Sequence, residues 1–135
     1  MNRIEKNSKQ NQLLDKGILL QSGQINKNKI NLISGAVTLP FLENVWVTTN
    51  GDTDTIIRMR DILTNLFNDG RETEMLDMLR LLYGVLGLQF PKDIAQLAYH
   101  PEAKQYFLFS FLLVFDDAIQ DYIADNRTQN ETTQI

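Results

Sequence analysis

The sequence predicts a mainly α-helical protein, a compact bundle of three to four helices with a possible short β-hairpin before the first long helix. Between residues 52 and 125, apolar residues recur at helical spacing, and residues typical of helix ends separate these stretches. The connections are only two to six residues long, which favours antiparallel packing. With 135 residues, 43% of them hydrophobic and 22% charged, the chain has the composition of one ordinary globular domain.

The first long helix is expected at residues 52–68. Asp52 or Thr53 can cap its start, because a short polar side chain accepts a hydrogen bond from the backbone N–H groups of the first turn. The pair Asp69-Gly70 is expected to end it, since glycine tolerates the left-handed conformation that closes many helices.

Three further helices are expected at residues 72–88, 92–99 and 101–125. Apolar residues wrap most of the circumference of the first of these, so we expect it to be largely buried. Pro101 suits the first position of the last helix. This helix is apolar on all faces up to Phe115, which predicts the central position in the bundle, or a surface covered by a second copy of the chain in a homodimer.

The segments outside these helices are polar or β-forming. Residues 1–29 are expected to be a basic polar arm, disordered or forming one short helix, and the segment around residues 24–31 to be a linker into the helical domain 30–125. Residues 32–49 are rich in β-forming side chains, which predicts an extended or hairpin segment with Pro40 on an edge strand. Residues 126–135 are expected to be a disordered polar tail.

Charge is distributed unevenly along the chain, although the net charge is only −4. The first 30 residues carry six cations against two acids, about +4, and the remaining residues carry about −8. A basic arm could bind nucleic acid, fold over the protein's own acidic face, or be a solvated leader. The six cations are Arg3, Lys6, Lys9, Lys16, Lys27 and Lys29.

Four carboxylates follow the apolar part of the last helix and form what we call the acidic stripe: Asp116, Asp117, Asp121 and Asp125. The last three are spaced by four residues, so they share one face of a helix. Like charges at this spacing repel each other, and the C-terminal end of a helix already carries negative partial charge. Solvent, a cation or a basic partner must therefore offset the repulsion.

Two aromatic residues of the predicted hairpin segment, Trp46 and Phe41, are candidate apolar anchors for a partner. Tryptophan is enriched among the residues that dominate binding energy in protein interfaces. A second interpretation of Trp46 is that it closes one end of the bundle core.

The segment Phe111–Tyr122, FLLVFDDAIQDY, resembles the aspartate-rich segment of class I terpene and isoprenyl diphosphate synthases. In that family, paired aspartates at the end of an apolar helix hold magnesium ions against a substrate diphosphate. The resemblance implies a leading pair at Asp116 and Asp117 and a trailing acid at Asp121. The spacing differs by one position from the commonest form, and the chain is much shorter than that catalytic fold, with no second acidic segment downstream.

The remaining patterns give no catalytic residues, metal ligands or cofactor. The chain has no cysteine, which excludes disulfides, thiolate nucleophiles and cysteine-ligated metals. Its only histidine, His100, precedes a proline at a helix start and is expected to be structural. Glycine pairs match neither phosphate-binding fingerprint. No signal peptide precedes the first helix, and the longest apolar run, Tyr106–Phe115, is shorter than the ~20 residues of a membrane span, so we expect a cytoplasmic protein.

These patterns favour a non-catalytic helical interaction module, such as a small adaptor, assembly factor or inhibitor, that binds a basic surface of another protein through its acidic helix end. The alternative is a nucleic-acid-associated regulator that uses the basic arm. A remote alternative is a protein that binds magnesium and diphosphate.

Overall fold

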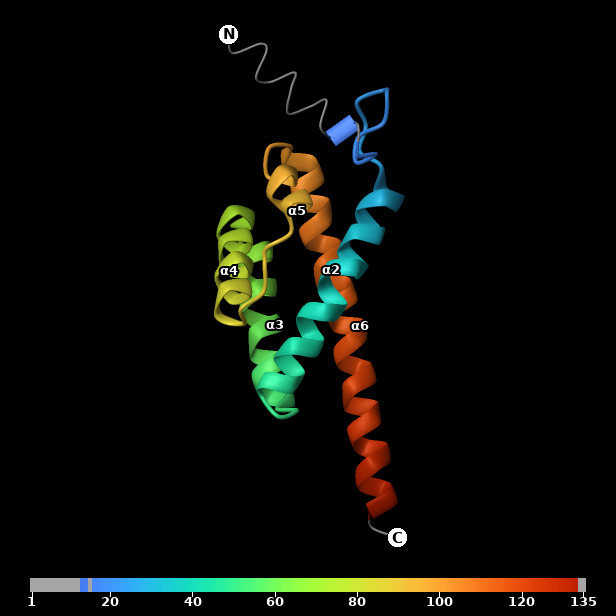
Figure 1. Cartoon of the computed structure of the whole chain (residues 1–135), viewed down its shortest axis with the longest axis vertical. Helices are drawn as coiled ribbons and strands as arrows, with labels where there is room; N and C mark the ends of the chain where they lie inside the picture. The colour runs from blue at the N-terminus through green and yellow to red at the C-terminus, as the bar shows by residue number, and fades with distance from the viewer. Residues whose placement is uncertain (1–12, 15, 134–135) are drawn as a thin grey trace.

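The computed structural model describes the backbone of residues 13–14 and 16–133 and the side chains of residues 13–14 and 16–124. This part of the chain is mainly helical and contains no strand, and five helices pack together in it. Figure 1 shows α2 descending from the upper end of the molecule, α3 rising from the lower end and α4 descending again. Helix α6 runs along the whole bundle and continues past the lower ends of the other helices. The helices are α2 (Lys27–Thr48), α3 (Thr53–Asn68), α4 (Glu72–Val85), α5 (Lys92–Leu97) and α6 (Pro101–Thr133).

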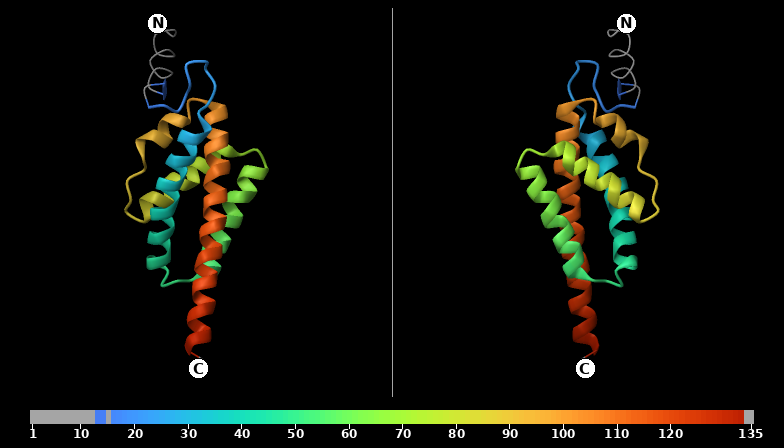
Figure 2. Two further views of the ribbon diagram at one scale, coloured as in Figure 1. Left: turned by 90° about the vertical axis from the view of Figure 1, so that its right-hand side faces the viewer. Right: turned by 90° about the vertical axis from the view of Figure 1, so that its left-hand side faces the viewer.

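Helix α6 is the central element, because it contacts each of the other four helices. In Figure 2, α2 and α3 lie on opposite sides of it. Its phenylalanines Phe107, Phe111 and Phe115 are buried, and their rings contact one another in a tilted arrangement at intervals of four residues. Phe111 also packs against Phe41 of α2, with 6.1 Å between the ring centroids. Burial of each ring contributes roughly 1.5–3 kcal/mol, so this row of aromatic side chains is the main apolar contribution of α6 to the core.

The predicted hairpin is wrong, because residues 32–48 belong to α2 and only Thr49 lies outside it, at the C-cap. The helix also begins earlier than expected, within the predicted linker, where the Asn26 side chain accepts a hydrogen bond from the backbone N–H of Lys29. Burial of β-forming residues such as Val37 and Val45 against the core outweighs their weak preference for strands. Among the described residues, the bundle therefore has five helices instead of the three to four expected.

Pro40 lies inside α2, a position where proline usually bends or breaks a helix. It has no N–H, so the carbonyl of Ala36 lacks the usual donor four residues later. Both residues are exposed, and water can therefore bond the freed carbonyl. An interior proline is tolerated here because it faces solvent.

Helix α4 lies at one side of the molecule and is only half buried, contrary to the expectation from its apolar circumference (Figure 1). Met75, Leu76, Leu79 and Tyr83 are buried, whereas Val85 is 76% exposed. The Tyr83 hydroxyl donates a hydrogen bond to the Val37 carbonyl of α2 over 3.1 Å, which ties this helix to the bundle.

The described part of the N-terminal segment packs on the core. Leu13, Ile18, Leu19 and Ile25 are buried, and Lys16 forms an ion pair with Asp93 of α5. The predicted arm is therefore anchored from Leu13 onward. Residues 1–12 and 15 lie outside the described residues.

The two ends of α6 differ from each other. At its start, the Nδ1 atom of His100 accepts a hydrogen bond from the backbone N–H of Ala103 over 3.2 Å, and Pro101 is the first helical residue. At its other end the helix continues to Thr133, so the residues predicted as a disordered tail are helical up to that point. No glycine or proline between residues 126 and 133 interrupts it.

Candidate interaction surfaces

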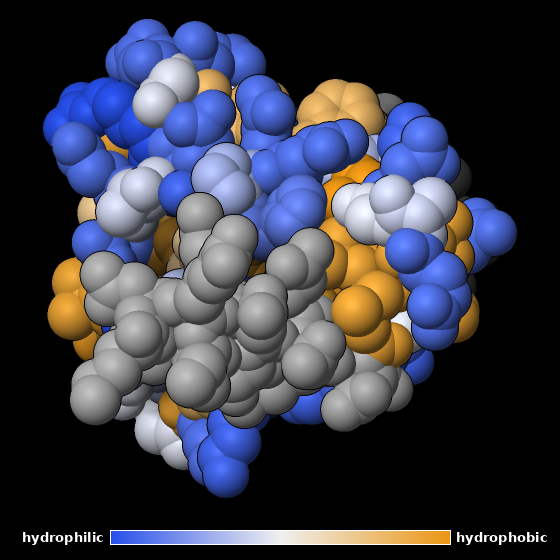
Figure 3. Space-filling view, turned by 90° about the horizontal axis from the view of Figure 1, so that it is seen from above, coloured by the Kyte–Doolittle hydropathy of each residue, from blue (hydrophilic) through white to orange (hydrophobic). Residues whose placement is uncertain are grey.

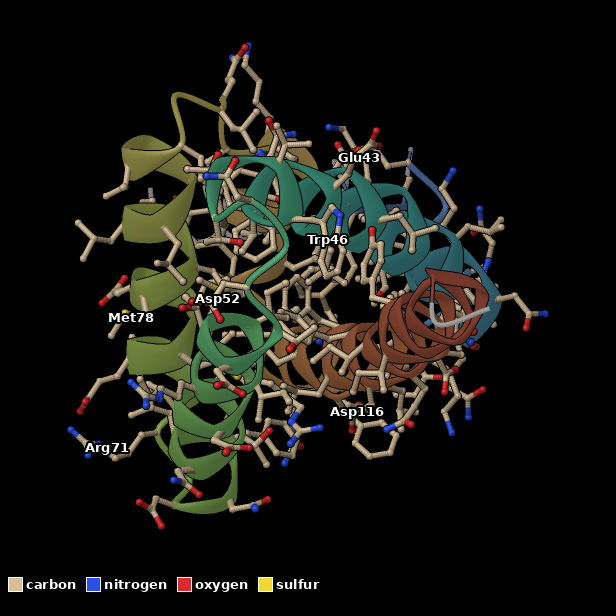
Figure 4. The ribbon with its side chains drawn as sticks, turned by 90° about the horizontal axis from the view of Figure 1, so that it is seen from below. Glu43, Trp46, Asp52, Arg71, Met78 and Asp116 are labelled. Atoms are coloured by element: carbon tan, nitrogen blue, oxygen red, sulfur yellow. The ribbon has the colours of Figure 1, made fainter. Side chains whose placement is uncertain are left out.

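Five carboxylates lie on α2, on α6 and directly before α3, and we call this set the acidic end. Seen from below in Figure 4, Glu43 of α2 and Asp116 of α6 lie on opposite sides of Trp46, and Asp52 lies before α3. The other members with described side chains are Asp117 and Asp121 of α6.

Asp116 is the one member of the acidic stripe whose charge is balanced in the described part of the protein. Its carboxylate lies 3.4 Å from the guanidinium of Arg60 on α3, which also contacts the neighbouring Asp61 at 3.1 Å. About half of the Asp116 side chain is exposed, so this pair contributes about 0–1 kcal/mol. The stripe is thus partly neutralised from within.

Asp117 and Asp121 face solvent. Among the described residues, neither of them forms an ion pair. The side chain of Asp125 lies outside the described part of the chain. The two exposed carboxylates therefore keep the unbalanced charge of the stripe, one helical turn apart.

Trp46 is half buried and packs against the core, so it closes the lower end of the bundle. Its indole ring stacks on Tyr122 of α6, with 4.6 Å between centroids and an angle of 11° between the planes. Gly51 also lies close to this ring: a Cβ atom there would come within 3.1 Å of the indole, and its φ of +76° also favours glycine. Burial raises the pKa of Tyr122, and the charge of Glu43 adds to the shift.

Phe41, the second predicted anchor, is fully buried, which corrects its assignment to partner binding. Its ring stacks on Tyr83 with 5.1 Å between centroids and also contacts Phe111. The sequence placed it on a hairpin, whereas the helical period of α2 turns it inward toward α6.

Asp52 is occupied as the N-cap of α3. Its carboxylate accepts hydrogen bonds from the Thr55 hydroxyl over 2.7 Å and from the backbone N–H of Asp54 over 3.2 Å. The Thr55 bond is the largest cause of the lowered pKa of this carboxyl. The Asp52 carboxylate therefore stays charged, but its oxygens already accept hydrogen bonds from within the protein.

Three of the six predicted nucleic-acid contacts have described side chains, and two of these have partners within the protein. Lys16 pairs with Asp93, and the ammonium of Lys27 lies 5.6 Å from the ring centroid of Tyr106. Lys29 is exposed. Arg3, Lys6 and Lys9 lie outside the described residues, so the nucleic-acid alternative remains a prediction.

A groove between α3 and α4 was not predicted from the sequence. It has a volume of about 270 Å³. Its lining is apolar apart from Thr55 and Arg58, so it offers few polar groups to select a ligand, and it is slightly smaller than typical ligand pockets. Met59 and Met78 are the signal that could have indicated it, because methionine is common on adaptable binding surfaces. The remaining lining residues are Ile62, Leu63 and Leu82.

Within the part of the chain that the structure describes, no group of three or more His, Asp or Glu side chains is placed to hold a metal ion. Asp116 turns to Arg60, which takes up one of the two carboxylates that the diphosphate-synthase resemblance would assign to magnesium. The remote alternative therefore gains no structural support.

Comparisons of the chain with protein-family models, with curated proteins and with solved structures gave no match in any of the three. Among the described helices, α2 alone is long and apolar enough to cross a membrane by length and composition. A third of its most apolar window is buried inside the protein, and the helix lies near the N-terminus.

Proposed function

We propose that this protein is a non-catalytic helical interaction module that binds a basic surface of another protein through its acidic end. The observation that carries the proposal is the pair Asp117 and Asp121, which are exposed and without an ion-pair partner among the described residues. They lie one helical turn apart on the solvent side of α6, close to the end of the bundle that Trp46 and Tyr122 close.

The arrangement of these carboxylates does not help the fold. Like charges four residues apart on a helix destabilise it by about 0.2–0.5 kcal/mol. No described cation balances Asp117 or Asp121, although Arg60 balances Asp116 close by. A charge arrangement that costs stability is reasonable where a partner supplies the missing counter-charge.

The acidic end would act mainly on the rate and orientation of association. Exposed charges steer a partner of opposite sign during diffusional encounter and fix its register, while contributing less to the final affinity. Trp46 and Tyr122 form a stacked, rigid aromatic floor at this end, against which a partner can settle without reordering it.

The proposal is tested with the double variant Asp117→Asn/Asp121→Asn. The amide side chains keep the shape and remove both charges, so we expect capture of partners from cells of the source organism to fall, most strongly at low salt. The matched control is Asp69→Asn/Asp77→Asn, which removes two exposed charges at other positions. Thermal unfolding should show that the first variant is at least as stable as the unchanged protein.

Equal capture by both double variants, at low and high salt, would reduce the stripe to a solubility feature. Loss of capture with the control variant as well would mean that net charge, and no particular surface, attracts the partner.

A further inference from the structure

Helix α2 has a second apolar face that points away from the bundle. Three large apolar side chains on this face have more than half of their surface exposed: Leu32 by 71%, Leu39 by 53% and Val47 by 67%. With Ala36, also exposed, they share one side of the helix, because their separations of three, four and eight residues are close to whole helical turns. Apolar groups also reach the surface on two sides of the molecule in the view from above (Figure 3).

This outer face of α2 carries opposite charges at symmetrical positions. Lys29 lies seven residues before Ala36 and Glu43 lies seven residues after it, which puts both on the same side of the helix as the apolar residues. Both are exposed, and among the described residues neither forms an ion pair. A rotation by 180° about Ala36 would exchange the two charges.

We propose that a second copy of the chain covers this face, with the two α2 helices packed antiparallel around a two-fold axis at Ala36. In this pairing Lys29 meets the partner subunit's Glu43, and the symmetry repeats the contact at the other end. Leu32 then lies against the partner subunit's Pro40 and beside the partner subunit's Leu39, again twice. The face is self-complementary in both charge and hydrophobicity, as a two-fold interface requires.

Small residues at the centre support the pairing. Gly35 lies beside Ala36, and a Cβ atom built on it would meet nothing within 4 Å. Glycine inside a helix costs about 0.5–1 kcal/mol relative to alanine, and no close neighbour within the described structure requires it. A second backbone that crosses here would approach closely where only a hydrogen and a methyl group intervene.

A membrane is the main competing occupant, since α2 passes the length and composition test for a membrane helix. The outer face, however, holds Glu43 between Leu39 and Val47, and a carboxylate amid apolar groups is unfavourable against a bilayer. Other large apolar side chains are exposed as well, among them Leu81 and Val85 on α4 and Phe109 and Leu113 on α6. Charge complementarity therefore favours a second copy on α2.

The size of the face sets the expected affinity. From Lys29 to Val47 the helix is about 27 Å long, and a helix with its side chains is about 10 Å wide. A strip of that size covers about 270 Å² on each copy, about 540 Å² in total, which is well below the ~1,200 Å² that stable interfaces bury. We therefore expect a reversible dimer with a dissociation constant of about 1–100 μM at low salt.

The test measures the dissociation constant of the full chain by sedimentation equilibrium over that concentration range. It compares the unchanged protein with variants in which the charge of Lys29, of Glu43 or of both is reversed. Lys29→Glu alone turns both ion pairs into repulsions and should weaken the dimer about tenfold or more. Glu43→Lys alone should do the same. The double variant K29E/E43K restores both pairs with reversed polarity and should return the dissociation constant to within about threefold of the original.

The charge reversals should leave the folded monomer stable, because Lys29 and Glu43 are exposed. Glutamate in the first turn of α2 also suits the helix dipole. The matched control is Lys92→Glu/Asp77→Lys, two exposed charges away from α2, which should leave the dimer unchanged. Leu32→Ser/Leu39→Ser should abolish the dimer without loss of helical circular dichroism.

Three results would overturn the proposal. One is a monomeric mass throughout the concentration range. A second is a dimer that both single reversals leave intact, which would indicate another interface. The third is a monomer that sediments with phosphatidylcholine/phosphatidylglycerol vesicles unless Leu32 and Leu39 are replaced by serine, which would assign the face to a membrane.

Discussion

Helices α2 and α6 pack on each other as the two longest elements, yet they use their apolar residues differently. Helix α6 directs a row of phenylalanines inward and carries unbalanced carboxylates on its lower part. Helix α2 buries one apolar face and leaves a second apolar face open, with one charge near each end. Both helices are rich in apolar residues, so apolar content alone does not separate the two roles. The distribution of charge along the exposed face does, and it is the basis on which we propose a basic partner for α6 and a second copy for α2.

The largest effect is expected for the inward face of α6. Phe111→Ala removes a fully buried ring that contacts Phe41, Phe107 and Phe115, and it should lower the free energy of unfolding by about 3–5 kcal/mol. The outward-facing Phe109 is 46% exposed, so Phe109→Ala should cost about 1 kcal/mol or less. Urea denaturation of both variants measures the difference.

Similar losses for the two variants would contradict the separation of α6 into an inner and an outer face. They would indicate that Phe109 is covered, for example by a second chain at the protein concentration used. Repeating the measurement at a tenfold lower concentration distinguishes a covered surface from an error in the fold, because only the first depends on concentration.

The next effect concerns the helical nature of α2. Pro40→Ala restores an N–H that can bond the Ala36 carbonyl, so it should raise the free energy of unfolding by roughly 1–2 kcal/mol. Greater freedom of the unfolded chain offsets part of this gain, by about 0.4–1 kcal/mol. Leu39→Ala, at an exposed position of the same turn, is the control: at protein concentrations below about 1 μM, where the proposed dimer is dissociated, it should change stability by about 0.5 kcal/mol or less.

A loss of stability in the proline variant, with no change in the control, would mean that residue 40 needs the fixed φ of proline. That outcome would return this segment to the extended conformation expected from its β-forming residues.

The difference between α2 and α6 also explains how far the sequence could predict the fold. Polar residues alternate with apolar ones at helical spacing in α3, and caps such as Asp52 mark its start, so the sequence is informative there. Helix α2 is apolar on two faces and contains β-branched residues and Pro40, so it has neither a helical period nor a helical composition. Its folded state depends on burial against α6, which local sequence does not express.

The sequence predicted part of the candidate surfaces, as it predicted part of the fold. Exposure of Asp117 and Asp121 follows from their spacing at the end of an apolar helix. The Arg60–Asp116 pair joins residues 56 positions apart, and such a contact requires the packing of α3 on α6. The inward direction of Phe41 could not be predicted either, because it depends on recognising α2 as a helix.

The smallest effect on stability, and the one that depends on pH, is expected from the hydrogen bond between Tyr83 of α4 and the Val37 carbonyl of α2. Tyr83→Phe removes the hydroxyl that bonds the Val37 carbonyl and should cost about 0.5–1.5 kcal/mol at pH 7. Tyr106→Phe, which keeps its ring beneath the ammonium of Lys27, is the control and should change stability less.

The pH dependence follows from burial, which raises the pKa of Tyr83 to about 12, whereas an unfolded tyrosine has a pKa of about 10. The folded state therefore keeps a proton that the unfolded state loses. This contribution is fully present below pH 10 and is lost as the pH rises from about 10 to 12. Urea denaturation at pH 7, 9 and 11 should show the stability advantage of the unchanged protein over Tyr83→Phe shrinking only at the highest pH. An advantage that stays constant across the series would mean that the hydroxyl reaches solvent, and that α4 is held to α2 by the stacked rings of Phe41 and Tyr83 without this hydrogen bond.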